Sequence, residues 1–425
     1  MARILLTCWG SHGDVDPFIG LGLALKARGH AATLATIEYY RPLVTSSGLG
    51  FRAMRPHVDP TQTDLLTRIM DGNRGSEFLL RELLFSAIRD TFEDVNQAAA
   101  DADVLVSHPI TYATPIVAEH RGLPWASVVL APTSFFSTHD YPVLPPAPWL
   151  KSLQPLGHWP GRLVVAFARF ATRRWPEPVY ALRAQLGMPR GAQPIFEGQH
   201  SPALVLALFS RLLGAPQPDW PQHVEVTGHV FHDAPHGDRL APELEAFLAD
   251  GSPPVVFTLG SSVVLIAKAF WRESIEAVQR LAMRAVLLVG PEQAPVLQAE
   301  LRQRGIANIM AVERAPHSLV FPRASVIVQQ CGIGTLAQGL RSGRPILAVP
   351  YAHDQPDNAW RAKQLGVARI LPPSRYKADR VASELEHLCG DAAYSRAAAR
   401  AAATIRQEGG VSAACDAIER TFGLR

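Results

Sequence analysis

The chain has 425 residues, of which 48% are hydrophobic and 19% are charged, a globular composition that excludes a disordered protein. Its 41 basic and 38 acidic side chains give a formal net charge of +3, and this small surplus is spread along the sequence. A nucleic-acid partner would need a clustered basic patch, so none is expected. At about 150 residues per domain, the length predicts two or three domains.

The cysteines and the first residues indicate the compartment. Cys8, Cys331, Cys389 and Cys415 lie too far apart in the sequence for a CxxC metal site and read as reduced thiols. The start, MARILLTCWG, lacks the apolar length and the cleavage site of a secretory signal. No apolar run approaches the roughly 18 residues of a membrane helix. We expect a cytoplasmic protein, with contact at the inner face of a membrane left open.

Short apolar runs alternate with helical patterns at 18–29, 243–250 and 269–282. The runs are rich in Val, Ile and Leu without strict alternation, which is typical of parallel strands covered by helices on both faces. This α/β pattern occurs twice and predicts two Rossmann-like, doubly wound domains. We predict strands at 3–9, 31–36, 103–108, 125–130, 203–209, 254–260, 285–290, 308–312, 325–329 and 345–350.

Two segments interrupt the alternation. The stretch GAPQPDWPQ (214–222) is rich in proline and polar residues, so we predict a linker there, between an N-terminal domain (1–213) and a C-terminal domain (223–425). The segment from about 135 to 200 is first aromatic and proline-rich, then helical and basic. It is interpreted either as an insertion that packs on the first domain or as a segment that lines an apolar pocket or touches a membrane.

Two loops are candidates for binding. CWGSHGDVDP (8–17) follows the first strand but does not match GxGxxG, so a dinucleotide fingerprint is not supported. QQCGIGTLAQGL (329–340) lies between a strand and a helix; Gly332 and Gly334 would let a ligand approach the backbone, and Thr335 would cap the helix. The N–H groups at such a helix start favour a phosphate.

A polar cluster, YAHDQPDN (351–358), follows the next strand. Ligands of open α/β sheets bind at the carboxyl ends of the strands. Asp354 and Gln355 offer paired acceptors and a donor there, which is the chemistry needed to bind sugar hydroxyls.

These stretches resemble a known family. VQQCGIGTLAQGLRSGRPILAVPYAHDQPDN, GSHGDVDPFIGLGLALKARGH, PPVVFTLGSS and ERAPHSLVFPRASVIV are similar to inverting nucleotide-sugar glycosyltransferases of the GT-B fold. The stretch 201–233 resembles most a UDP-glycosyltransferase-like bacterial branch that contains a rhamnosyltransferase of rhamnolipid synthesis. The resemblance implies two Rossmann-like domains facing a cleft, with the acceptor in the first and the nucleotide sugar in the second.

The resemblance also implies donor-site roles. Ser261 and Ser262 would approach the diphosphate, Arg314 and Ala315 would border the base, and Gly332, Gly334 and Thr335 would cradle the phosphates. Family members carry one or two histidines where this chain has Gln329 and Gln330. A glutamine amide still donates a hydrogen bond but carries no positive charge, so we expect a diphosphate site with a weakened cationic element.

Inverting transfer needs a base for the acceptor proton. By resemblance the base is Asp14, and a carboxylate in a closed apolar cleft would have a raised pKa. His12 is the alternative base, and Asp16 would cap the helix at 18–29. DVD (14–16) and DAD (101–103) resemble DxD metal motifs, but no His or Cys joins them, so no metal or other cofactor is expected.

Two functions are weighed. The first is a glycosyltransferase that moves a sugar such as rhamnose or glucose from a dTDP or UDP donor to a hydroxyl of a hydrophobic or lipid acceptor. The second is a non-catalytic partner or activator of another enzyme, suggested by the missing histidines.

Overall fold

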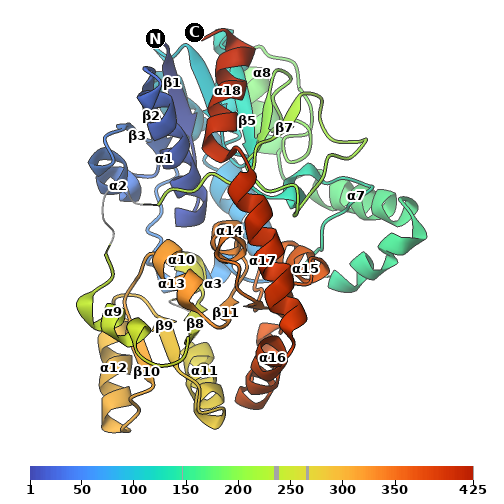
Figure 1. Cartoon of the computed structure of the whole chain (residues 1–425). Helices are drawn as coiled ribbons and strands as arrows, with labels where there is room; N and C mark the ends of the chain where they lie inside the picture. The colour runs from blue at the N-terminus through green and yellow to red at the C-terminus, as the bar shows by residue number, and fades with distance from the viewer. Residues whose placement is uncertain (146, 234–238, 265–267, 425) are drawn as a thin grey trace. The chain divides into compact units, whose positions relative to one another are not determined.

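The computed structural model describes residues 1–145, 147–233, 239–264 and 268–424, without the side chains of Ser261, Ser262 and Lys268. These residues form two compact units, each built around a parallel sheet (Figure 1). Unit 1 contains Met1–Pro60, Gly72–His232 and Glu408–Arg425, and unit 2 contains Thr61–Asp71 and Asp233–Gln407. The predicted α/β class with two doubly wound sheets is confirmed.

The sheet of unit 1 has seven parallel strands in the order β3-β2-β1-β4-β5-β6-β7. All five strands predicted for this half of the chain are present, and the short edge strands β3 and β7 are additional. The strands are β1 (Arg3–Thr7), β2 (Ala31–Thr36), β3 (Gly50–Ala53), β4 (Val104–Ser107), β5 (Trp125–Val129), β6 (Val205–Ala207) and β7 (Val224–Val226).

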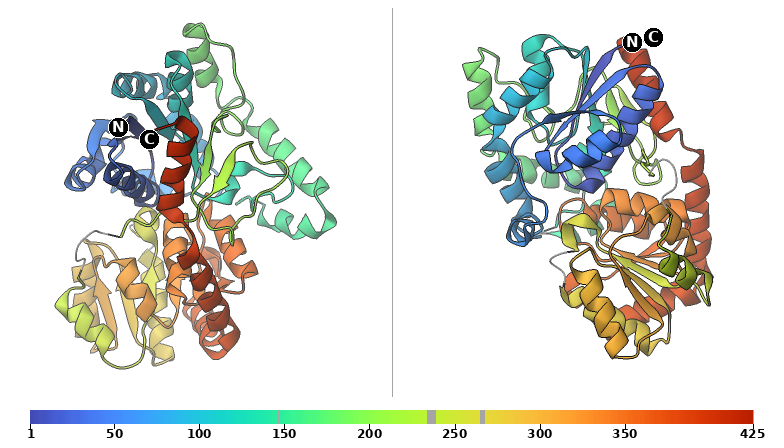
Figure 2. Two further views of the ribbon diagram at one scale, coloured as in Figure 1. Left: turned by 45° about the horizontal axis from the view of Figure 1, so that its top comes forward. Right: turned by 90° about the vertical axis from the view of Figure 1, so that its left-hand side faces the viewer.

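Helices cover both faces of this sheet, and the segment 135–200 forms η4, α7 and α8 of unit 1 (Figure 2). The helices of unit 1 are α1 (His12–Ala27), η1 (Glu38–Tyr40), α2 (Arg41–Ser46), α4 (Gly75–Glu77), the π-helix η2 (Phe78–Phe85), α5 (Ile88–Ala98), α6 (Ala113–Arg121), η3 (Pro132–Phe135), η4 (Pro148–Leu156), α7 (Trp159–Thr172), α8 (Glu177–Gln185) and α18 (Gly410–Phe422).

The sheet of unit 2 has six parallel strands in the order β10-β9-β8-β11-β12-β13, of which only β13 was not predicted. The strands are β8 (Val255–Thr258), β9 (Ala285–Leu288), β10 (Ile309–Val312), β11 (Ile327–Gln329), β12 (Ile346–Ala348) and β13 (Ala368–Ile370). The helices are α3 (Thr63–Ile69), α9 (Pro242–Ala249), α10 (Gly260–Val263), α11 (Lys268–Arg280), α12 (Gln293–Gln303), α13 (His317–Val320), η5 (Phe321–Arg323), α14 (Ile333–Ser342), α15 (Gln355–Gln364), η6 (Pro373–Arg375), α16 (Ala378–Gly390) and α17 (Ala392–Gln407).

Alternate strand residues fill two apolar clusters in unit 2. Val255 and Phe257 of β8 belong to one cluster, and Val256 belongs to the other. Successive side chains of a strand point to opposite faces, so this sheet is buried on both faces. That arrangement explains why its strands read as continuous apolar runs in the sequence.

The division between the units differs from the predicted boundary at 214–222. This stretch lies inside unit 1, where Trp220 stacks on Phe135 with ring centroids 4.1 Å apart. Asp219 accepts hydrogen bonds from the Ser137 hydroxyl and the Thr138 N–H, both at 2.6 Å. The polar, proline-rich composition therefore marks a surface loop of unit 1. Apart from Thr61–Asp71, the chain enters unit 2 only after His232.

The C-terminal helix α18 belongs to unit 1, although the sequence placed it in the second domain. The Arg28 guanidinium donates to Asp416 at 2.6 Å and to Glu419 at 2.8 Å. Glu419 also lies 3.0 Å from Nε2 of His30. These polar contacts connect α18 to the end of α1.

Among the described residues, no helix combines the length and the apolar character needed to cross a membrane.

Two histidines, the buried His229 and the partly buried His200, predict acid sensitivity of unit 1. Burial lowers the pKa of both His200 and His229 to about 4. Their imidazoles titrate near 6.5 in the unfolded chain, so the unfolded state binds more protons between these values and stability falls as the pH drops from 6.5 toward 4. We expect a loss of roughly 2 kcal/mol per histidine between pH 7 and pH 5, measured by urea unfolding.

The variant His229→Phe should show about half of this pH dependence, because its ring does not titrate. The exposed His387 provides the control, and His387→Asn should leave the dependence unchanged. Equal pH dependence in His229→Phe and the parent protein would contradict the assignment.

Candidate active site

Each sheet reverses its strand order once, and the candidate residues follow the strands at these points. In unit 1, β1 lies between β2 and β4, and in unit 2, β8 lies between β9 and β11. Crevices at such points are the usual ligand sites of open parallel sheets. In unit 1 the loop 8–11 follows β1 and His108 follows β4; in unit 2 the loops after β8, β11 and β12 lie side by side.

The loop after β1 holds the carboxylate of Asp14 at the start of α1. The Asp14 Oδ2 atom accepts hydrogen bonds from the backbone N–H of Ser11 at 2.8 Å and from its hydroxyl at 3.0 Å. Gly10 has φ +147°, and a Cβ there would lie 2.3 Å from Oδ2. Only glycine is compatible with this approach. The helix begins at His12 with Ser11 as its N-cap, so the prediction that Asp16 caps it was wrong.

His108 contacts the other oxygen of Asp14. Its Nε2 atom lies 3.4 Å from Asp14 Oδ1, and the N–H of Ile110 donates to its Nδ1 atom at 3.5 Å. Because Nδ1 is an acceptor, Nε2 carries the proton that points to the carboxylate. The His108 ring is buried, with the edge of Phe18 against it at a centroid distance of 5.6 Å. This contact fixes the direction of the Asp14 carboxylate.

The environment lowers the pKa of Asp14. Burial alone would raise it, but the hydrogen bonds from His108 and from the Ser11 donors outweigh burial and lower the pKa below its ordinary value. The expectation of a raised pKa was therefore wrong. Its physical reason is the set of donors around the carboxylate, which an apolar cleft would not provide.

His12, the alternative base, lies one helical turn from Asp16. Its Nδ1 atom is 3.7 Å from Asp16 Oδ1, and its ring meets the edge of Tyr40 at a centroid distance of 5.0 Å. The side chain is 34% exposed, so solvent or a substrate reaches it.

A pocket open to solvent lies in unit 1, with Trp9 from the loop after β1 and Ile110 from the loop after β4 among its lining residues. The indole N–H of Trp9 donates to the carbonyl of Pro56 at 3.0 Å, which fixes one wall. Most of its lining side chains are aliphatic or aromatic. Its lining residues are Trp9, Met54, Arg55, Pro56, Leu84, Ile88, Thr91, Ile110, Thr111 and Tyr112.

The loop after β11 buries both glutamines. Gln329 ends β11, and within the described residues neither its amide oxygen nor its amide nitrogen has a hydrogen-bond partner. The Gln330 amide nitrogen lies close to two backbones, because a Cβ would approach it to 2.2 Å at Gly260 and 3.2 Å at Gly332. Gln330 thus places an amide donor between the loops that follow β8 and β11.

The turn that follows differs from the predicted one. The left-handed residue is Cys331, with φ +65°, whereas Gly332 has φ −57° and is the N-cap of α14. Thr335 is the third residue of the helix, so the prediction that it caps the helix was wrong. Gly334 lies in the first turn of α14, where backbone N–H groups have no acceptor within the helix. A helix therefore starts after β11, as predicted, and its role in binding an anion stays a prediction.

Asn358 connects the loops after β11 and β12. Its buried side-chain amide donates to the carbonyl of Cys331 at 3.0 Å and to Asp354 Oδ2 at 2.7 Å. Gln355 accepts the N–H of Tyr351 at 2.9 Å through Oε1, so this oxygen holds its own loop. Of the predicted sugar-binding pair, Gln355 therefore has only its amide nitrogen for a ligand. Asn358 was not predicted from the sequence, although it is the last residue of the polar cluster 351–358 and lies one helical turn after Asp354.

The remaining donor-site residues are placed as follows. The side chains of Ser261 and Ser262 lie outside the described residues, although their backbone belongs to α10. Arg314 follows β10, two strands from β8, and its side chain is 75% exposed near Glu313 at 3.7 Å. Ala315 packs partly buried against the apolar cluster around Val256.

Comparisons with known proteins identify the family. Residues 295–409 match the family described as erythromycin biosynthesis protein CIII-like, C-terminal domain. The chain is 31% identical over 428 residues to the O-mycaminosyltylonolide 6-deoxyallosyltransferase of Streptomyces fradiae, covering 98% of this chain and 97% of that protein. This chain belongs to the GT-B glycosyltransferases.

Other similar proteins are also named glycosyltransferases. A sterol 3-beta-glucosyltransferase of Pichia angusta is 25% identical over 425 residues, 98% of this chain but only 33% of that protein. The solved structure of the spinosyn rhamnosyltransferase SpnG, complexed with thymidine diphosphate, superposes with a TM-score of 0.71 at 18% identity over 99% of this chain and 100% of that one. The chain is thus a nucleotide-sugar glycosyltransferase, the first of the two functions weighed from the sequence.

No cluster of three or more His, Cys, Asp or Glu side chains suited to a metal ion occurs in the parts of this glycosyltransferase that the structure describes. Of the two DxD-like stretches, DAD ends at Asp103, whose carboxylate forms an ion pair with Arg3 at 3.0 Å. His108 was not linked to Asp14 from the sequence. Its position at the end of the strand beside β1 is the signal that would have linked it to Asp14.

The contact of Gly260 with Gln330 predicts a destabilised variant. Gly260→Ala adds a Cβ at φ +62° and 2.2 Å from the Gln330 amide nitrogen. Gly305→Ala is a matched control, since Gly305 has φ +65° with nothing within 4 Å of the added Cβ. Urea unfolding should show a loss of roughly 1–3 kcal/mol in both variants from backbone strain, and a further loss in Gly260→Ala alone. Equal losses in the two variants would refute the contact.

Proposed function

We propose that this glycosyltransferase moves a sugar from a dTDP-sugar to a hydroxyl of a hydrophobic acceptor, with inversion at the anomeric carbon. The observation that carries the proposal is the gathering of three loops at the reversal point of the second sheet, with the Gln330 amide and the start of α14 among them. Backbone N–H groups and a side-chain amide at a helix N-terminus suit a diphosphate. UDP is the alternative nucleotide.

The names of the relatives support a deoxysugar. The Streptomyces fradiae relative transfers a 6-deoxyallosyl group, and the spinosyn structure is a rhamnosyltransferase with thymidine diphosphate. We propose rhamnose or a similar 6-deoxyhexose, with glucose as the alternative, since the sterol relative is named a glucosyltransferase. Asp354 would accept hydrogen bonds from the sugar hydroxyls, and Gln355 would contribute its amide nitrogen.

The other donor-site roles follow the family resemblance. Gln330, Gly332, Gly334 and Thr335 would surround the diphosphate, with Ser261 and Ser262 approaching it from the loop after β8. Gln329 would support Gln330 from the end of β11. Arg314 and Ala315 would border the base. We propose that no metal ion or cofactor is required, because backbone donors and the helix start would stabilise the leaving diphosphate.

The transfer is a single displacement. The acceptor oxygen forms a bond to the anomeric carbon, the bond from that carbon to the diphosphate oxygen breaks, and the diphosphate leaves with the electron pair. We assign the acceptor proton to Asp14. Its support is an ionised carboxylate held by Ser11 and His108 next to the apolar pocket of unit 1. His12 is the second candidate, with Asp16 beside it.

The acceptor is proposed to be a lipid or another apolar alcohol. The pocket beside Trp9 supports this, because its walls are mainly apolar. A hydroxylated fatty acid, as in the rhamnolipid branch, is the specific candidate, while the relatives named above act on a macrolide or a sterol. We propose a cytoplasmic enzyme that contacts the inner face of the membrane where such acceptors reside.

Replacing Asp14 tests the base. Asp14→Asn should lower transfer at least about 100-fold, because general base catalysis contributes roughly 100- to 10,000-fold, and nucleotide binding should remain. The lowered pKa keeps Asp14 ionised in mild acid, so the rate should fall only below about pH 4. An imidazole base would lose activity near neutral pH instead. Full turnover in Asp14→Asn together with inactivity of His12→Gln would transfer the role to His12.

Nucleotide titration tests the donor site. Calorimetry with dTDP and with UDP, both in EDTA, should show micromolar binding of dTDP and weaker binding of UDP. Micromolar binding would show that the neutral glutamines are tolerated in the diphosphate site. If dTDP, UDP, GDP and ADP all fail to bind, the proposed donor site is wrong. Activity that disappears in EDTA and returns with Mg²⁺ or Mn²⁺ would overturn the proposal of a metal-free reaction.

A further inference from the structure

Large apolar side chains are exposed mainly in one part of unit 1. Ten such side chains are exposed among the described residues, and six of them belong to the 22 residues from Trp149 to Phe170, on η4 and α7. We call these six the α7 patch: Trp149, Leu156, Trp159, Leu163, Phe167 and Phe170. Concentration of exposed apolar side chains in one surface region marks an interaction site, whereas scattered ones need no explanation.

The helix α7 presents three separate faces. At about 100° per residue, Trp159, Leu163, Phe167 and Phe170 fall within an arc of about 80°. The three patch residues Leu163, Phe167 and Phe170 are 62%, 67% and 62% exposed. A second face buries Pro160, Gly161, Val164 and Val165. A third, between them, carries Arg162, Arg169 and Arg173.

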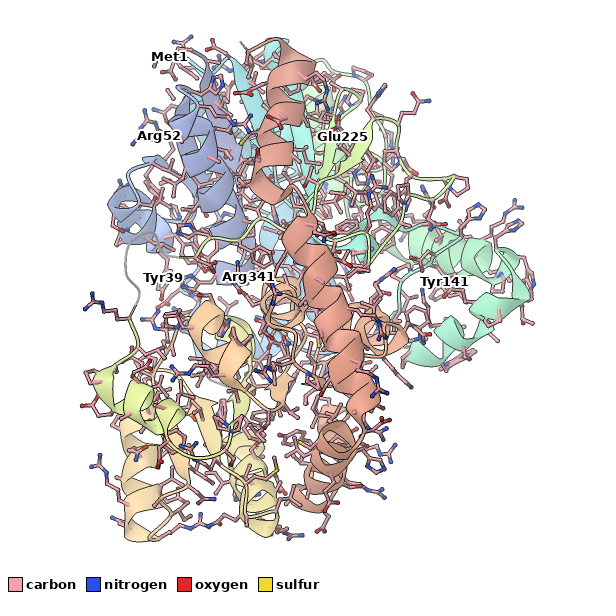
Figure 3. All side chains as sticks on the ribbon, viewed as in Figure 1. Met1, Tyr39, Arg52, Tyr141, Glu225 and Arg341 are labelled. Atoms are coloured by element: carbon pink, nitrogen blue, oxygen red, sulfur yellow. The ribbon has the colours of Figure 1, made fainter. Side chains whose placement is uncertain are left out.

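The buried face holds α7 firmly against unit 1. A Cβ at Gly161 would lie 2.0 Å from the carbonyl oxygen of Thr138, so the helix packs directly on that backbone. The buried Lys151 ammonium donates to Asp140 at 2.9 Å, and the Tyr141 hydroxyl donates to the carbonyl of Leu150 at 2.9 Å. The apolar patch is therefore presented by a fixed element at the side of unit 1 (Figures 1 and 3).

The charges around the patch favour an anionic partner. From Tyr141 to Pro176 the sequence has five basic residues, Lys151, Arg162, Arg169, Arg173 and Arg174, and no Asp or Glu. Arg173 stacks over the ring of Phe170 at 3.9 Å, so it extends along the patch. Arg169 forms an ion pair with Glu197 and Lys151 is buried, which leaves Arg162, Arg173 and Arg174 as the basic rim.

We propose that the α7 patch docks the enzyme on an anionic lipid bilayer. Tryptophan and phenylalanine side chains beside arginines suit the boundary between headgroups and acyl chains. A second copy of the chain fits less well, because a symmetric contact through this patch would bring two basic rims together. The inference extends the membrane contact in the proposed function and does not depend on the identity of the donor.

Vesicle co-sedimentation of the full chain tests the docking. Vesicles of equal parts phosphatidylglycerol and phosphatidylcholine should bind the protein, pure phosphatidylcholine vesicles should bind it more weakly, and added salt should weaken the first interaction. The double variant Leu163→Ser and Phe167→Ser should bind at least about tenfold more weakly, since it removes two large apolar side chains. Arg162→Gln and Arg174→Gln should each cost about fivefold on the anionic vesicles alone.

The control is Val296→Ser on α12, where the parent side chain is 69% exposed and lies outside the patch. It should bind like the parent protein. Absence of binding to anionic vesicles, or equal binding by the double variant and this control, would overturn the proposal. So would a dimer in solution that the double variant dissociates. Calorimetric dTDP binding by the double variant reports on the donor site separately, so a failure of the proposed function is recognised independently.

Discussion

Parallel strands end at one edge of a sheet, and the candidate residues of each unit depend on this constraint. In unit 1 the sheet continues from β1 to β2 on one side and to β4 on the other. In unit 2 it continues from β8 to β9 on one side and to β11 on the other. The connections on the two sides of that point run in opposite directions and leave a crevice between them. Polar groups that are far apart in the sequence therefore meet at this crevice. Asp14 and His108 meet in unit 1 in this way, and Gly260, Gln330 and Asn358 in unit 2. Helices cover both faces of each sheet, so the edge at the carboxyl ends of the strands is where a ligand can bind.

The donors that position Asp14 also determine its chemistry. A carboxylate that accepts from Ser11 and lies beside His108 is oriented and ionised at neutral pH, but the same interactions lower its pKa and so weaken it as a base. The donors that orient the Asp14 carboxylate thus also make it a weaker base. A proton transferred from an acceptor hydroxyl to Asp14 would weaken the hydrogen bonds that its carboxylate accepts from Ser11. The His108 ring would keep its orientation, because its Nδ1 atom accepts the Ile110 N–H. In its proposed role as base, Asp14 would act mainly through its position next to the attacking hydroxyl rather than through a high pKa.

The sequence predicted the apolar centres of the sheets better than their edges. Runs such as VVFT and VLVS are buried on both faces, so hydrophobicity alone reveals them. The missed strands GFRA, VEV and ARI are short edge strands with charged residues, which hydrophobicity does not distinguish from loops. The predicted linker was misread because proline and polar residues mark surface loops as well as hinges, and the stacking of Trp220 on Phe135 is a contact over 85 positions. The positions of the loops after β1, β11 and β12 were predicted correctly. The contacts of Asp14 with His108 and of Asn358 with Cys331 depend on tertiary packing and were not predicted.

The two glutamines are explained by their burial. Gln329 is fully buried and Gln330 nearly so, and the Gln330 amide nitrogen lies so close to Gly260 that a Cβ added there would approach it to 2.2 Å. A cation at such a position without a ligand would carry a large desolvation cost, whereas a neutral amide left without a partner costs only about 1–3 kcal/mol. A diphosphate between the loops would accept the Gln330 N–H and recover part of that cost. In the proposed donor site, a neutral amide would forgo the charge-assisted bond to the diphosphate but would cost less than a cation when no ligand is bound. The start of α14 would supply the remaining attraction for the anion.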